Sequence, residues 1–174
     1  EYLGGVGTGA ARWKTAIPSN VYEGSWYSDT LSANQKFTQE QIDNIKVKLG
    51  TKVFDKKSEY SVGTTVNTEG KITGFEIIFH TKTEGVTKSN PITIEYESTP
   101  DLSGLKEGEV RTFENVGRIY YNVKLYLTAN AQAQYTQYKD FSKAAGDYNA
   151  ANKQITWYLM LNENSKMSGN ATIT

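Results

Sequence analysis

The stretch Ile-Thr-Gly-Phe-Glu-Ile-Ile-Phe-His, residues 72–80, decides the fold class of this chain. Its apolar side chains alternate, so that Phe75, Ile77 and Phe79 fall on one face of an extended segment. Alternation with a period of two is typical of a β-strand that buries one face. We therefore expect residues 72–80 to be a strand lying over a hydrophobic core.

Similar short runs recur along the chain and are separated by turn signals, among them Gly50 and Asn67-Thr68-Glu69-Gly70. A spacing of roughly ten residues between strands, with few helices, favours a β-sandwich. The fold class predicted is all-β, an immunoglobulin-like β-sandwich with one or two short helices. The expected strands are 45–49, 60–66, 72–80, 92–96, 118–128, 155–161 and 169–174.

Two segments carry helical signals. Thr38-Gln39-Glu40-Gln41 has the spacing of a capping box, which predicts a helix of about two turns from Thr38 to Ile45. Residues 131–145 are rich in Ala and Gln, both good helix formers, and predict a second helix.

Composition excludes several classes of function. The 19 basic residues balance the 19 acidic ones, so the chain has no nucleic-acid footprint. There is no cysteine, which removes disulfides, thiolate metal sites and cysteine nucleophiles. His80 is the single histidine, so any Ser-His-Asp triad or histidine metal site would need it. We expect no cofactor, no metal and no turnover enzyme.

The segment Lys143-Ala-Ala-Gly-Asp-Tyr-Asn-Ala-Ala-Asn-Lys-Gln-Ile-Thr-Trp-Tyr-Leu-Met-Leu-Asn162 resembles the opening of Cna-like, collagen-binding-type domains of Gram-positive surface adhesins. That family opens with a lysine, a Gly-Asp turn and a Trp-bearing strand. Residues 29–35, Asp-Thr-Leu-Ser-Ala-Asn-Gln, resemble a later segment of the family. Residues 113–122, which include Asn115, resemble its late strand.

The resemblance implies an intramolecular isopeptide bond between a lysine and an asparagine, assisted by an acid. Carried over by motif, Asn115 is the acceptor and Asp29 the acid. Burial would keep a lysine amine neutral and a carboxyl protonated, which is what attack on an amide requires. The domain would modify itself once and release ammonia. The bond would then constrain the unfolded chain much as a disulfide does.

The lysine is assigned to Lys143, with Lys14 as the alternative. Lys143 follows Asn115 in the chain, whereas the lysine of the family precedes both partners. Lys14 precedes both partners, but it follows Trp13, whereas the lysine of the family comes before the Trp-bearing strand. Three explanations stay open. In the first, residues 1 to about 140 form a domain without its leading lysine, and Lys143 opens the next domain. In the second, 141–174 completes the sandwich by permutation or strand swapping. In the third, no cross-link exists.

Function follows from the resemblance as an expectation. The domain at 1–140 is expected to be a cell-surface adhesin module that binds a host extracellular-matrix protein or another surface ligand. Neighbouring domains or further copies of the chain are possible partners, and the cell wall is the expected attachment. The alternatives are a structural stalk or pilin-like module, and a carbohydrate-binding module. No apolar run reaches membrane-spanning length, and Glu1 opens the chain without a signal-peptide pattern, so we expect a mature chain or an excised fragment.

Overall fold

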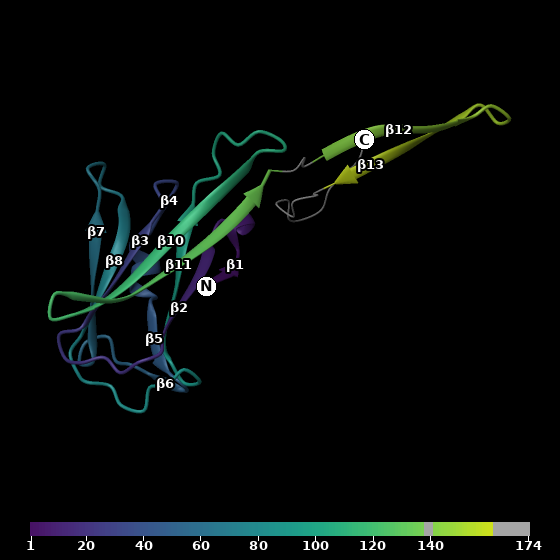
Figure 1. Ribbon diagram of the computed structural model, residues 1–174. Helices are drawn as coiled ribbons and strands as arrows, with labels where there is room; N and C mark the ends of the chain where they lie inside the picture. Colours follow the sequence, from purple (N-terminus) through teal and green to yellow (C-terminus); the bar gives the residue numbers. More distant parts are fainter. Residues whose placement is uncertain (138–140, 162–174) are drawn as a thin grey trace.

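Two antiparallel sheets form the body of this computed structural model, which describes residues 1–137 and 141–161 (Figure 1). The first sheet has the order β1-β2-β9-β5-β6, with β4 paired to β9. Its strands are β1 (Tyr2–Gly4), β2 (Ala11–Ile17), β4 (Gln35–Lys36), β5 (Lys46–Leu49), β6 (Lys52–Val53) and β9 (Ile92–Pro100). A 3₁₀ turn, η1 (Val6–Thr8), lies between β1 and β2.

The second sheet has the order β11-β10-β3-β8-β7. Its strands are β3 (Trp26–Leu31), β7 (Tyr60–Val66), β8 (Ile72–Phe79), β10 (Val110–Tyr121) and β11 (Lys124–Thr136). The one described α-helix, α1 (Gln39–Asp43), joins β4 to β5. The predicted all-β sandwich is therefore confirmed.

The core lies between the two sheets and is built from the inward face of each strand. In β8, Phe75, Ile77 and Phe79 are buried while Glu76 and Ile78 are exposed, which confirms the alternation expected at 72–80. Phe75 meets Tyr96 of the opposite sheet edge to face, with ring centroids 4.9 Å apart. Such a pair adds about 1 kcal/mol to the area that it buries.

The capping box predicted at Thr38 is confirmed at the start of α1. The Thr38 side chain accepts a hydrogen bond from the Gln41 backbone N–H, and the Gln41 side chain accepts one from the Thr38 N–H. Two donors that the first helical turn leaves free are thereby satisfied.

The helix predicted over 131–145 is wrong. Residues up to Thr136 belong to β11, which pairs with β10, and β12 begins at Phe141. The run Ala131-Gln-Ala-Gln-Tyr135 alternates, with Ala133 and Tyr135 buried and the glutamines exposed. Pairing along a whole neighbouring strand outweighs the helix propensity of Ala and Gln, which is only a weak prior.

The single strand predicted over 118–128 is also wrong, because a hairpin turn divides it. β10 ends at Tyr121 and β11 begins at Lys124. Asn122 and Val123 between them have φ values of 48° and 62°. Two consecutive residues in the left-handed region define the type I′ turn, whose twist suits a hairpin.

The C-terminal segment forms a separate two-stranded sheet of β12 (Phe141–Asn149) and β13 (Gln154–Leu161), drawn apart from the sandwich in Figure 1. Within the described residues these strands pair only with each other. The expected strand 155–161 is therefore confirmed, while 169–174 lies outside the described residues. The domain boundary near 140 stays a prediction.

Candidate functional site: a buried acid–amide pair between the sheets

Asp29 lies in the middle of β3, which is flanked on both sides by strands. Its neighbours on the same face of the strand, Tyr27 and Leu31, are core residues, so alternation turns the carboxyl group inward as well. Only 1% of Asp29 is exposed. A carboxyl group in such a place is costly unless hydrogen-bond donors surround it.

Three donors surround the Asp29 carboxyl group. The Tyr27 hydroxyl donates to Oδ2 at 2.5 Å, and the Tyr96 hydroxyl donates to the same oxygen. Asn115 Nδ2 donates to Oδ1 at 3.0 Å. Asn115 is 3% exposed, so acid and amide meet in an interior from which water is largely excluded.

Gly117 makes room for this cluster. It lies opposite Asp29 across the β3–β10 pairing. A Cβ atom at this position would come within 2.5 Å of the Tyr27 hydroxyl. The missing side chain therefore lets the Tyr27 ring lie against β10 with its hydroxyl on the acid.

Burial is the largest influence on the acid. Desolvation raises the pKa of Asp29 from 3.8 to about 6, although the hydrogen bonds from Tyr27, Tyr96 and Asn115 lower it. Desolvation, followed by the Asp29 charge, raises the pKa of both tyrosines well above 10. The tyrosines thus stay neutral donors, and Asp29 changes its protonation close to neutral pH.

The structure brings together two of the site residues predicted from the sequence, Asp29 and Asn115. Lys14 lies between Trp13 and Thr15, which both face the interior, so its side chain starts on the outer face of β2. Lys143 lies in β12, opposite Leu159 of β13. The cross-link itself stays a prediction.

Sequence reasoning missed Tyr27, Tyr96 and Gly117. Tyr27 carried a signal, since it lies two residues before Asp29 and alternation puts both on one face. Tyr96 is 67 positions from Asp29 and carried none. It reaches the acid only because β9 packs across the interior from β3.

A small cavity at the edge of the first sheet has the amide of this pair, Asn115, in its lining. Its volume is about 130 Å³, and its walls include Glu1, Lys14, Thr15, Tyr96 and Asn115. The amino group of Glu1 donates to the Lys14 carbonyl at 2.9 Å, which holds the start of the chain along β2. A side chain that enters here would reach the Asn115 carboxamide.

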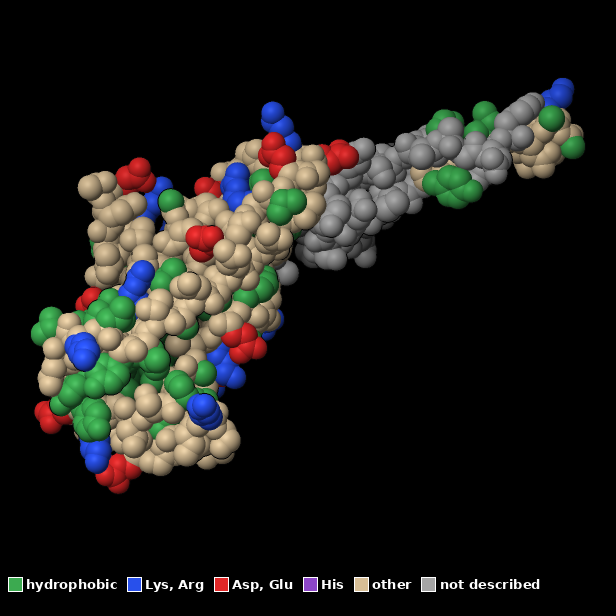
Figure 2. Space-filling model, viewed as in Figure 1, with side chains coloured by type: hydrophobic (Ala, Val, Ile, Leu, Met, Phe, Trp, Pro, Cys, Tyr) green, Lys and Arg blue, Asp and Glu red, His purple; other side chains and the backbone are tan. Residues whose placement is uncertain are grey.

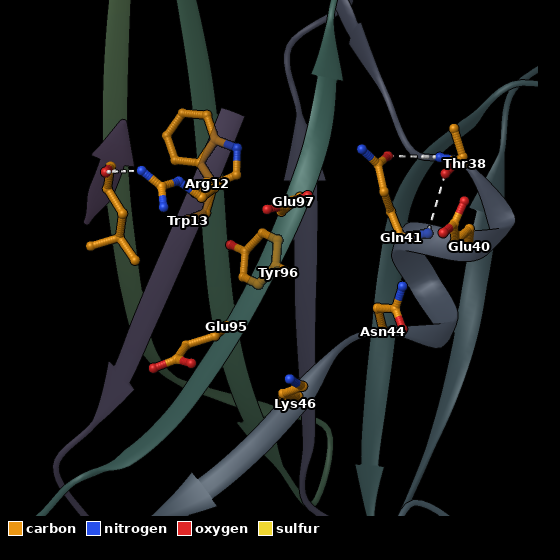
Figure 3. A pocket seen from close by; sticks show the side chains of 11 residues that line it. Arg12, Trp13, Thr38, Glu40, Gln41, Asn44, Lys46, Glu95, Tyr96 and Glu97 are labelled. Atoms are coloured by element: carbon orange, nitrogen blue, oxygen red, sulfur yellow. Dashed lines mark hydrogen bonds between the residues drawn. The ribbon is translucent and has the colours of Figure 1, made fainter. Parts of the chain in front are cut away.

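A larger groove of about 640 Å³ lies on the first sheet, between β2 and α1, with β9 running through it (Figure 3). Its lining includes charged side chains of both signs. Arg12 of β2 is directly opposite Glu97 of β9. Lys46 of β5 is opposite Glu95 of β9, and Glu40 projects from α1. The groove is suited to a polar ligand with charges of both signs.

An apolar patch lies at one end of the sandwich. Hydrophobic side chains gather in Figure 2 where Figure 1 places the β10–β11 turn. Val123, Leu125 and Tyr126 are exposed there. On the outer face of the same sheet, Tyr120 stacks on Trp26 with ring centroids 4.9 Å apart and planes at 10°. Each of these two rings thereby covers one face of the other.

His80 follows β8 directly and contacts Ser61 of β7, with Oγ and Nε2 3.0 Å apart. A catalytic serine–histidine pair also needs a carboxylate that orients the ring. Within the described residues no carboxylate is hydrogen-bonded to the His80 ring. Nor do those residues contain a cluster of acidic or histidine side chains that could hold a metal ion.

No family model and no curated protein matches the sequence. Among solved structures, the chain is similar to ACE19, the collagen-binding subdomain of the Enterococcus faecalis surface protein ACE, with 16% identity and a TM-score of 0.43 over 72% of this chain and 85% of that one. It is also similar to the pilus backbone RrgB of Streptococcus pneumoniae, with 13% identity and a TM-score of 0.43 over 90% and 83%. A third is the major pilin GBS80 of Streptococcus agalactiae, a 35 kDa C-terminal fragment, with 11% identity and a TM-score of 0.44 over 84% and 54%.

The fold and the site define an immunoglobulin-like sandwich with a buried acid–amide pair between its sheets. Within the described residues no helix combines the length and apolar character needed to cross a membrane.

Proposed function

We propose that this chain is a cell-surface adhesin or pilin-like module of a Gram-positive bacterium, stabilised by a lysine–asparagine bond that it forms itself. The observation that carries the proposal is the contact between Asn115 and Asp29 inside the sandwich, at 3.0 Å. The resemblance of residues 29–35 and 113–122 to Cna-like domains supports the same pairing.

The surroundings of the pair favour amide exchange. Asn115 offers the electrophilic Cγ, and Asp29 holds a proton up to about pH 6. An amine brought into the same interior loses its hydration, which favours the neutral, nucleophilic form. Fixing amine and amide in contact replaces a slow bimolecular reaction by an intramolecular one. The chain acts once, so we propose no turnover enzyme.

The amine reaches Asn115 through the cavity beside Glu1. Lys143 remains our candidate, and it would come from β12 of a neighbouring copy or from a rearranged hairpin. Lys14 already belongs to the lining of this cavity, and its amine would have to turn toward Asn115. A lysine placed ahead of Glu1 would continue β1 past Thr15 and enter directly, because β1 runs antiparallel to β2.

Intact mass under denaturing conditions tests the cross-link. We expect the chain to be lighter than its sequence by one ammonia, or, where the lysine comes from a neighbouring copy, joined chains that lack one ammonia for each bond. Peptide mapping should join Asn115 to one lysine. Asn115→Ala and Asp29→Asn should both restore the full mass. If the unaltered chain already has its full mass, alone and with a lysine added ahead of Glu1, the cross-link is refuted.

For the ligand, we propose that the charged groove between β2 and α1 binds a host matrix protein of the collagen type. Charges of both signs along β2 and β9 match a polypeptide with charges of both signs. Binding of a triple-helical collagen-like peptide should weaken on Arg12→Glu and stay unchanged on Arg118→Glu, because Arg118 lies in the other sheet. If the unaltered chain does not bind, the proposal of a collagen-type ligand is refuted.

A further inference from the structure

The hydroxyl group of Tyr96 lies between the acid and the amide. It contacts Asp29 Oδ2, and it is 3.2 Å from Asn115 Oδ1. The Tyr27 hydroxyl shares the contact with Asp29 Oδ2 and otherwise contacts Thr15 at 2.9 Å and the Tyr96 hydroxyl at 3.5 Å. Of the two tyrosines, Tyr96 is therefore the one that reaches the amide oxygen.

The orientation of the amide decides how the acid can act on it. Asn115 presents Nδ2, its amino group, to Asp29 Oδ1 at 3.0 Å. Its carbonyl oxygen is directed to Tyr96 instead. The carboxyl group thus faces the group that leaves in the reaction, while the oxygen that gains negative charge faces a phenol.

A phenol has one proton to donate and can accept another, which makes Tyr96 a relay. When Asp29 is ionised, the Tyr96 hydroxyl donates its one hydrogen bond to Oδ2. When Asp29 is protonated, it can donate to the Tyr96 oxygen, and the Tyr96 proton is then free for Asn115 Oδ1. Protonation of the acid is in this way transmitted to the amide oxygen over two hydrogen bonds.

We propose that Tyr96 is a catalytic residue of the lysine–asparagine cross-linking reaction, and that it stabilises the charge that develops on Asn115 Oδ1. This proposal rests on the proposed function. As the neutral amine attacks, the bond from Nζ to Cγ of Asn115 forms and the bond from Cγ to Nδ2 breaks. One Nζ proton passes by way of Asp29 to Nδ2, which leaves as ammonia. No electrons enter or leave the site.

Two matched variants test this role. Tyr96→Phe and Tyr27→Phe each remove one hydroxyl from Asp29 Oδ2 and keep the ring in the core. Only Tyr96→Phe also removes the donor to Asn115 Oδ1. Loss of one such donor typically slows a reaction about 10²-fold or more. We expect that loss for Tyr96→Phe and a change below about tenfold for Tyr27→Phe, for which only the positioning of Asp29 is affected.

The rate is measured on newly made full-length chain. Labelled protein is made in a short pulse of cell-free synthesis, and samples are quenched in denaturant at intervals. Intact-mass spectrometry of each sample then follows the loss of ammonia. The unaltered chain should react more slowly as the pH rises above about 6, because Asp29 then loses its proton. Tyr96→Phe should flatten this pH profile, which a merely structural tyrosine would not do.

Equal rates for Tyr96→Phe and Tyr27→Phe would overturn the role of Tyr96 while leaving the cross-link in place. An unaltered chain that never loses ammonia would overturn the proposed function as well, so the two failures are distinct. If Tyr96→Phe does not fold, 3-fluorotyrosine in place of Tyr96 keeps the hydroxyl and makes it a stronger donor. That replacement should speed the reaction, and an unchanged or lower rate overturns the proposal.

Discussion

The buried acid Asp29 should make the stability of this domain fall as the pH rises from acid to neutral. Its pKa in the folded chain is about 6, against 3.8 for an exposed aspartate. Between these two values the folded chain holds a proton that the unfolded chain has released. The contribution of Asp29 to the free energy of unfolding is therefore fully present below about pH 3.8 and is lost as the pH rises through about 6.

The size of the effect follows from the difference between the two pKa values. That difference is about 2.2, from 3.8 to about 6. Because one pKa unit corresponds to about 1.36 kcal/mol, the free energy of unfolding falls by about 3 kcal/mol. The hydrogen bond from Asn115 lowers the pKa of Asp29, so removing Asn115 leaves the loss at least as large.

Exposed carboxyl groups act in the opposite direction. Hydrogen bonds lower the pKa of Asp55, Glu59, Glu69 and Asp101, and these groups lose stability as the pH falls. The comparison must therefore be a difference between two chains. Asn115→Ala, in which no cross-link can form, is set against the double variant that also carries Asp29→Asn.

The assay is urea unfolding followed by tryptophan fluorescence, over a pH series from about 3.5 to about 7.5. The single variant should lose about 3 kcal/mol across this range relative to the double variant. Parallel curves, or a single variant that gains stability as the pH rises, would show that Asp29 does not keep its proton in the interior, and the reasoning about the acid would fail.

Three further changes test the packing and the local structure, each read out by urea unfolding. Gly117→Ala forces Tyr27 off the acid and should cost about 1–3 kcal/mol, whereas Gly63→Ala, with no atom within 4 Å of the new Cβ, should cost nothing; equal effects would contradict the close contact. Val123→Gly should add about 1 kcal/mol, because the left-handed backbone at this exposed turn favours glycine, and a loss would argue against the type I′ turn. Thr38→Ala should cost about 1 kcal/mol by removing the cap of α1, and an unchanged stability would mean that the cap contributes nothing.

Much of the fold could be predicted from the sequence because its signals are local. The alternation in 72–80 marks a strand whichever partner it has, and the capping box at Thr38 involves backbone groups within one turn. The failures were also local in cause. In 118–128 the turn Asn122-Val123 lacks glycine, so alternation on its two sides reads as one strand. In 131–145 the helix propensity of Ala and Gln was given more weight than the alternation of buried and exposed side chains in 131–135.

The sequence by itself indicated which chemistry the chain carries: by resemblance an acid at Asp29 and an amide at Asn115, and by composition no thiol and no second histidine. Only the tertiary structure decided that Asp29 and Asn115 touch and that Tyr96 reaches both. The physical reason is the distance along the chain over which each signal acts. Alternation fixes the face of each side chain within its strand, whereas the contact between strands 67 or 86 positions apart depends on the register and packing of both sheets.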